Sequence, residues 1–132
     1  MNLQLPLKTK WFELTKAGIK TEDYREINEY WYARLVDRNN LRSFKKASLA
    51  FVVAMANQDP PKSFAIEANR IYQGCFKPFA QNTMTLGYPK TTDTERILKL
   101  EHKGIEIRTG NPEWGAEPNK LYFVIKHGKP TK

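Results

Sequence analysis

Apolar and polar residues alternate at the start of the chain and then change to a helical spacing. The leucines between residues 3 and 7 occupy every second position, which is the period of a half-buried strand. Over residues 9–17 the apolar side chains fall instead on one stripe of a helix, with Thr9 placed to cap its start. Gly18 supplies a residue that tolerates the left-handed conformation at a helix end. We therefore predict a short strand followed by a helix that ends at Gly18.

A second helix is predicted after a short extended segment. Residues 20–25 are typical of a strand, in which Lys20 and Asp23 would point to opposite faces. Asn28 is a suitable cap for a helix that carries Trp31 on its apolar side. The three rings at residues 30–32 are consecutive, so one helix face cannot bury all of them. At least one ring is expected to be exposed or to line a cleft.

The remaining apolar runs are short. Runs with the length or spacing of strands occur at residues 49–55, 64–68, 98–100, 105–107 and 121–125. Residues 74–90 are expected to form a loop with one short strand at most, and residues 95–102 also fit a helix. Five or six strands with two amino-terminal helices predict an α+β fold. A small β-barrel would hide the edges of such a sheet.

Length and composition are those of one soluble globular domain. The chain has 132 residues, 40% hydrophobic and 27% charged, so we expect a single domain over residues 1–132. No apolar run is long enough to cross a membrane, and the amino terminus lacks the pattern of a secretion signal, which predicts a cytoplasmic protein. Cys75 is the only cysteine, and its spacing from His102 and His127 in the sequence matches no metal-binding motif. We expect neither a metal nor another cofactor.

The charge of the chain favours a polyanionic partner. The formal net charge is +8 and the pI is about 9.6. Lysine and arginine are partly clustered, at residues 38–46 and again at 120–132. Such a surplus attracts nucleic acid through counterion release, although evenly spread lysines also serve solubility alone. The clustering favours nucleic acid.

Several short motifs together resemble the ASCH domain family in its phage-like and bacterial branch. They are Gly18-Ile19-Lys20, Tyr24-Arg25-Glu26, Tyr30-Trp31, the loop Gly110-Asn111-Pro112-Glu113-Trp114-Gly115-Ala116-Glu117-Pro118, and Tyr122-Phe123-Val124-Ile125-Lys126. The resemblance spans nearly the whole chain and is loose between residues 44 and 97. It implies a PUA-like β-barrel, a cleft between the barrel and the amino-terminal helices, and binding of RNA or a nucleotide.

The residue types in these motifs suit such a ligand. Lys20 and Arg25 can contact phosphate groups, which position a nucleic acid without reading its sequence. Trp114, or an exposed ring such as Trp31, can stack on a base. Glu113 or Glu117 can accept a hydrogen bond from a base amino group. Each residue also has a structural interpretation. Lys20 and Arg25 could form a charged strand edge, Trp114 could close the end of the barrel, and Glu113 or Glu117 could cap a turn.

The resemblance also implies an enzymatic alternative. Some small bacterial members remove the acyl group from N4-acetylcytidine with a lysine, a threonine three residues later and a distant glutamate. Lys20 matches the lysine, but Asp23 stands at the threonine position, with Thr21 out of register. A carboxylate cannot form the acyl intermediate as a hydroxyl does, so Asp23 would act as a general base toward water. Glu113, or else Glu117, stands in for the glutamate.

The leading hypothesis is therefore binding of RNA or a modified nucleoside through Lys20, Arg25, Trp31 and Trp114 in a basic cleft. The alternative is an amidohydrolase acting on N4-acylated cytidine through Lys20, Asp23 and Glu113, or a ribonuclease. A protein-interaction module has only the exposed aromatic residues in its favour.

Overall fold

Strands outnumber α-helices among the residues that the structure describes. The computed structural model describes residues 1–37, 66, 68–70, 72 and 74–131. The strands and helices are β1 (Asn2–Leu7), α1 (Thr9–Lys16), β2 (Glu22–Arg25), α2 (Glu29–Leu35), β3 (Gln81–Leu86), β4 (Ile97–Thr109) and β5 (Leu121–Pro130). Two short 3-10 turns, η2 (Thr94–Arg96) and η3 (Pro112–Trp114), precede β4 and β5.

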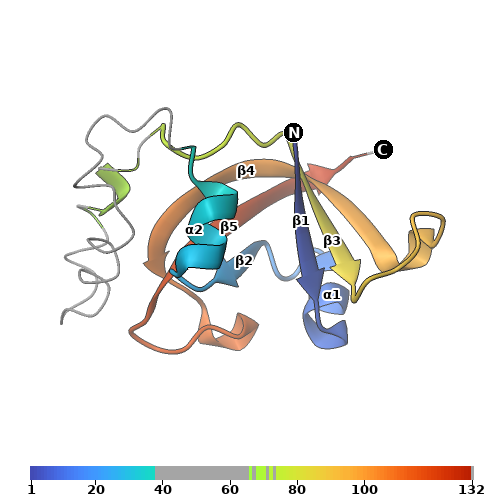
Figure 1. Cartoon of the computed structure of the whole chain (residues 1–132). Helices are drawn as coiled ribbons and strands as arrows, with labels where there is room; N and C mark the ends of the chain where they lie inside the picture. The colour runs from blue at the N-terminus through green and yellow to red at the C-terminus, as the bar shows by residue number, and fades with distance from the viewer. Residues whose placement is uncertain (38–65, 67, 71, 73, 132) are drawn as a thin grey trace. The chain divides into compact units, whose positions relative to one another are not determined.

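The strands form one mixed sheet in the order β1-β3-β4-β5-β2. β1 and β3 lie side by side and run parallel, with Asn2 opposite Gln81 (Figure 1). β3 and β4 are antiparallel, with Gln81 opposite Glu101. Parallel neighbours need a long connection, and the 73 residues between β1 and β3, Lys8 through Ala80, include α1 and α2. The α+β class predicted from the sequence is confirmed.

The described chain divides into two compact units. The first unit comprises residues 1–23, 78–104 and 125–132, and the second comprises residues 24–77 and 105–124. β4 and β5 are long enough to contribute residues to both units. Each unit is described by itself below.

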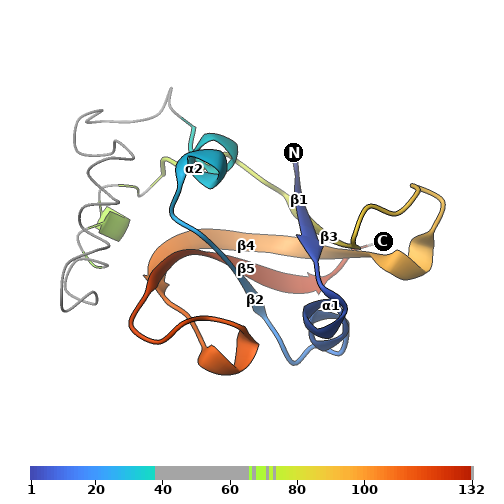
Figure 2. The same cartoon turned by 60° about the horizontal axis from the view of Figure 1, so that its bottom comes forward.

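In the first unit, α1 packs against β3, and Figure 2 shows α1 directly after β1. The leucines of β1 are buried, as the alternation predicts, and Phe12 is the buried ring of α1. The helix begins one residue earlier than expected, because Lys8 rather than Thr9 is the N-cap residue. Gly18 has a φ of 77°, so the predicted left-handed residue at the helix end is confirmed.

In the second unit, α2 begins where the sequence predicts. The side chain of Asn28 accepts a hydrogen bond from the Trp31 amide at 3.0 Å and so caps the helix. Tyr32 and Leu35 are buried, whereas the Tyr30 side chain remains 56% exposed. The prediction that one face cannot bury all three consecutive rings is confirmed.

Other strand predictions need correction. The run at 49–55 and Phe64 lie outside the described residues. Ile66 and Ala68 are helical, with Ile66 exposed and Ala68 buried, because residues two apart on a helix point in nearly opposite directions. The runs 98–100 and 105–107 belong to one continuous strand, β4, so the alternative helix is wrong. Gly104 has a φ of 116°, a conformation that glycine tolerates, and β4 therefore continues through it.

Candidate functional site

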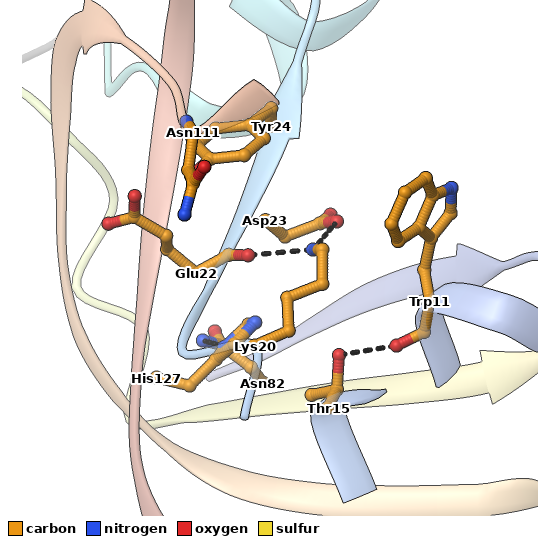
Figure 3. Close-up of polar contacts among 9 residues, drawn as sticks. All are labelled: Trp11, Thr15, Lys20, Glu22, Asp23, Tyr24, Asn82, Asn111 and His127. Carbon is orange, nitrogen blue, oxygen red and sulfur yellow. Dashed lines mark hydrogen bonds and ion pairs between the residues drawn. The ribbon is translucent and has the colours of Figure 1, made fainter. Parts of the chain in front are cut away.

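A buried ion pair lies between α1 and β2 in the first unit. The Lys20 ammonium is 3.2 Å from Asp23 Oδ1 and donates a hydrogen bond to the Glu22 carbonyl at 2.7 Å (Figure 3). Lys20 and Asp23 are only 2% and 5% exposed. The two side chains meet because β2 begins at Glu22, so the strict alternation predicted for residues 20–25 does not extend back to Lys20. Lys20 is therefore a buried ion-pair partner rather than part of a solvated strand edge.

The burial of this pair is unusual for charged side chains. Lysine and aspartate are almost never fully buried unless they are paired, because removing each charge from water costs several kcal/mol. Paired and buried ionisable groups are common in functional sites, although structural ion pairs share these features. In this conformation the Lys20 ammonium is not presented at the surface, where a nucleic-acid phosphate would meet it.

Two histidines and one asparagine form a second polar cluster in the same unit. Asn82 on β3 is fully buried, and its side chain lies 2.7 Å from both His102 Nδ1 and His127 Nδ1. Its amide nitrogen also donates to the Lys126 carbonyl at 3.3 Å. The sequence predicted His102 and His127 to be ordinary surface residues, and this is wrong because both rings are partly buried against β3.

The hydrogen bonds of Asn82 determine which ring nitrogens carry protons. The Lys126 carbonyl can only accept, so the amide nitrogen of Asn82 must face Lys126 and His127. The amide oxygen then faces His102, whose Nδ1 must donate. His127 Nδ1 must accept, which places the proton of the neutral ring on Nε2. Asn82 thus fixes opposite tautomers on the two histidines.

Burial favours the neutral form of both histidines. The pKa of His127 is lowered to about 4, chiefly by burial, while Asp23 opposes this shift and Lys20 adds to it. Burial also lowers the pKa of His102, and the Lys126 ammonium acts in the same direction. The His127 Nε2 atom is buried and has no hydrogen-bond partner among the described residues.

The second unit carries alternating cations and aromatic rings at α2. The Arg25 guanidinium lies 4.7 Å from the Trp31 ring centroid, and the Arg34 guanidinium lies 4.3 Å from that of Tyr30. The Tyr30 and Trp31 rings meet edge to face at 5.2 Å. We call these four residues the α2 cation–aromatic ladder. It includes Arg25 and Trp31, two of the ligand-binding residues predicted from the sequence.

Two tyrosine hydroxyls bind backbone amides of the loop that contains Glu113 and Trp114, two of the predicted site residues. Tyr24 accepts a hydrogen bond from the Asn111 amide, and Tyr122 accepts one from the Glu117 amide, both at 2.9 Å. Glu113 and Glu117 are exposed, and Trp114 is half-buried. The short turn η3 lies inside a loop that the sequence predicted to be irregular.

The structure brings together some of the predicted site residues. Lys20 and Asp23 are in direct contact in the first unit, as are Arg25 and Trp31 in the second. Thr21 is exposed and accepts a hydrogen bond from the His127 amide through its carbonyl. Glu113, Glu117 and Trp114 belong to the second unit, so one pocket shared with Lys20 stays a prediction. Asn82 and His127 were missed because no local motif marks them.

Across residues 1–37 and 74–131, and the few described between them, no group of three or more His, Cys, Asp or Glu residues is arranged to hold a metal ion. None of the described helices has the length and apolar character that a membrane crossing requires. Comparisons with protein-family models, with curated proteins and with solved structures give no match.

Proposed function

We propose that the protein binds RNA or a modified nucleoside, and that the α2 cation–aromatic ladder contacts the bases and phosphates. The observation that carries this proposal is the position of Arg25 and Arg34 over two neighbouring rings, one of which, Tyr30, is 56% exposed. Proteins that bind single strands combine positive charge with rings on which bases stack. The net charge of +8 adds a general attraction for a polyanion.

The ladder combines the two kinds of group that base stacking and phosphate contact use. Tyr30 is the exposed ring on which a base would stack, and the guanidinium of Arg34 beside it would bring a cation close enough to contact a phosphate. The resemblance to ASCH domains, with the PUA-like barrel that it implies, supports the same class of ligand. Trp114 is proposed as an additional stacking ring from the loop before β5.

Binding of fluorescein-labelled single-stranded RNA, measured by anisotropy at low salt, tests the proposal. Tyr30→Ser removes the exposed ring, and the loss of one stacked base is worth about 1–3 kcal/mol, or roughly 5- to 150-fold in affinity. Tyr88→Ser is the matched control because Tyr88 is 93% exposed and lies outside the ladder. Equal affinities of the two variants, or no binding of RNA by the unaltered protein, would contradict the proposal.

A second candidate function is hydrolysis of N4-acylated cytidine at the Lys20–Asp23 pair. Its specific support is the burial of both charged groups in direct contact, at positions that match the lysine and the threonine of the hydrolytic ASCH members. Because both side chains are buried, a substrate reaches the pair only after local opening. Glu113 or Glu117 takes the place of the family glutamate in this proposal.

The proposed reaction uses water as the nucleophile. Asp23 accepts a proton from water as the water oxygen bonds to the acyl carbon, and the carbonyl electron pair moves to oxygen beside the Lys20 ammonium. When the electron pair on this oxygen re-forms the carbonyl bond, the bond between the acyl carbon and N4 breaks. The proton held by Asp23 then passes to N4. The products are cytidine and the carboxylic acid.

Conversion of N4-acetylcytidine to cytidine, followed by chromatography, tests this second function. Asp23→Asn should abolish turnover, whereas Thr21→Ala should leave it unchanged because Thr21 is exposed and its contact with the His127 amide is made by the backbone carbonyl, which the variant keeps. Loss of turnover in Glu113→Gln or in Glu117→Gln shows which of the two takes the place of the family glutamate. Labelled RNA in the same assay tests the ribonuclease alternative, which predicts shortened strands. Full turnover by Asp23→Asn would exclude the proposed base.

A further inference from the structure

The histidine cluster in the first unit is not used by the reaction described above. His102, Asn82 and His127 come from three different strands, β4, β3 and β5, and are joined by two hydrogen bonds of 2.7 Å. Asn82 leaves His127 as a neutral ring with its proton on Nε2. A buried polar atom normally has a partner, and the Nε2 atom has none among the described residues.

His127 is attached to the segment that carries the ion pair. Its backbone amide donates to the Thr21 carbonyl at 3.0 Å, which connects β5 to the residues between Lys20 and Asp23. Figure 3 shows the His127 ring and Asn82 near the base of the Lys20 side chain. The electrostatic influence of Lys20 and Asp23 on His127 also places all three within one local environment.

We propose that His127 is a catalytic hydrogen-bond donor of the Lys20–Asp23 site, whose Nε2–H binds the carbonyl oxygen of an amide ligand. Asn82 and His102 are positioning residues, which hold the ring in the required tautomer. The proposal rests on the amidohydrolase function proposed above. It adds a donor that neither the motifs nor the family resemblance assigns.

A neutral donor suits this place better than a charged one. Neutral imidazoles with lowered pKa values polarise substrate carbonyls in other enzymes. A second cation beside Lys20 would be repelled by it and would compete for the carboxylate of Asp23, which the reaction needs as a base. Because Nε2 is buried, the carbonyl can reach it only when the surrounding side chains open locally.

Long-range ¹⁵N NMR of the full chain tests the tautomer and the contact together. At pH 7 the expected ¹⁵N signals of His127 are those of an unprotonated Nδ1 and a protonated Nε2. Addition of N4-acetylcytidine to the variant Asp23→Asn, which should not turn it over, should shift the Nε2 and Hε2 signals, whereas cytidine, which lacks the acyl carbonyl, should not. A protonated Nδ1 at pH 7 overturns the proposal. So does a ligand that shifts the Lys20 ammonium signal and leaves His127 unchanged.

Variants separate this proposal from the function on which it rests. His127→Phe keeps a ring but removes the donor, and kcat for N4-acetylcytidine should fall roughly 10²-fold, with a smaller change in KM. His127→Gln, which retains an amide donor, should recover part of that loss. Asn82→Asp presents only acceptors to both histidines, so it should move the His127 proton to Nδ1 and lower kcat. Turnover that survives in His127→Phe overturns the role of His127 alone, whereas absence of turnover and of ligand shifts in the unaltered protein overturns both proposals.

Discussion

At the scale of single residues, the buried Lys20–Asp23 pair makes the strongest prediction about stability. Lys20→Met removes the ammonium beside the buried Asp23 carboxylate, and removal of one partner of a buried pair typically costs about 3–5 kcal/mol. We expect a loss of this size in the free energy of unfolding, measured in urea at neutral pH. Asp23→Leu should be similarly destabilising because it removes the carboxylate that lies beside the buried ammonium.

The double variant Lys20→Met with Asp23→Leu is the informative control. With both charges removed, apolar side chains of similar size occupy the site, and such replacements of buried pairs are often neutral or stabilising. The double variant should therefore be more stable than either single variant. If the two single losses simply add, the side chains act independently and the pair is not coupled.

The buried histidines predict how stability depends on pH. The pKa of His127 in the folded chain is about 4, below the ordinary value of 6.5, so the unfolded chain binds more protons between these values. The free energy of unfolding should thus be fully retained above pH 6.5 and should fall as the pH drops toward 4, by up to on the order of 3 kcal/mol. His102 contributes in the same direction. Urea unfolding at several pH values measures this dependence.

The variant His127→Gln removes this titration while an amide oxygen remains to accept from Asn82. Its stability should change less between pH 6.5 and pH 5 than that of the unaltered protein. An identical pH dependence in both proteins would show that His127 is not the responsible group. His102→Gln measures the smaller share of the second ring in the same way.

The candidate site was only partly predictable from the sequence, for a physical reason. Lys20 and Asp23 stand in one short motif, and Arg25 and Trp31 are close enough in sequence for α2 to bring them together. Asn82 has an ordinary position in a strand, and its importance depends on two histidines that other strands supply. Their burial follows from sheet pairing over long sequence distances, which no local pattern records.

At the scale of elements, prediction succeeded where one local pattern sufficed. The alternation of β1 and the capping residue Asn28 of α2 depend on neighbours within a few positions. β4 was predicted as two strands because glycine often interrupts a strand, yet one strand runs from Ile97 to Thr109 through Gly104. The strand predicted at residues 64–68 is wrong at Ile66 and Ala68, because two apolar residues at a spacing of two fit a strand and fit opposite sides of a helix equally well.

The start of the loop before η3 makes a prediction at this scale. A Cβ atom on Gly110 would lie 2.6 Å from Ala116 Cβ and 2.7 Å from a carbon of the Tyr24 ring, so both neighbours must move. Gly110→Ala should cost about 1–3 kcal/mol, as overpacking commonly does. It should also disturb the hydrogen bond from the Asn111 amide to the Tyr24 hydroxyl. Urea unfolding and the near-ultraviolet tyrosine signal measure the two effects.

Gly128→Ala is the matched control for Gly110→Ala. The nearest atom to its added Cβ is also at 2.6 Å, but that atom is Lys103 Cε, near the end of a flexible side chain that is 58% exposed. The lysine can move at little cost, although Glu101 Cβ at 3.0 Å leaves some crowding. Gly128→Ala should therefore be the milder substitution. A larger loss for Gly128→Ala would contradict this account of the loop.

At the scale of the whole molecule, the positive charge sets how binding depends on salt. For single strands, log K falls with log salt at a slope of about −0.7 for each phosphate neutralised, because bound counterions are released. If Arg25 and Arg34 each contact a phosphate, the variant Arg25→Gln with Arg34→Gln should have a slope shallower by about 1.4. Anisotropy titrations of single-stranded RNA at several salt concentrations measure the slope.

A control with the same loss of charge separates local contacts from general attraction. Lys8 and Lys16 are exposed residues at the two ends of α1, and Lys8→Gln with Lys16→Gln removes two positive charges, as the arginine variant does. If net charge alone attracts RNA, the two double variants should lose affinity equally and share one slope. If the ladder is the contact surface, only the arginine variant should change the slope, because counterions are released only where phosphates are neutralised. Equal slopes would show that RNA is attracted by the net charge of +8 as a whole. They would exclude the α2 cation–aromatic ladder as the RNA-binding surface.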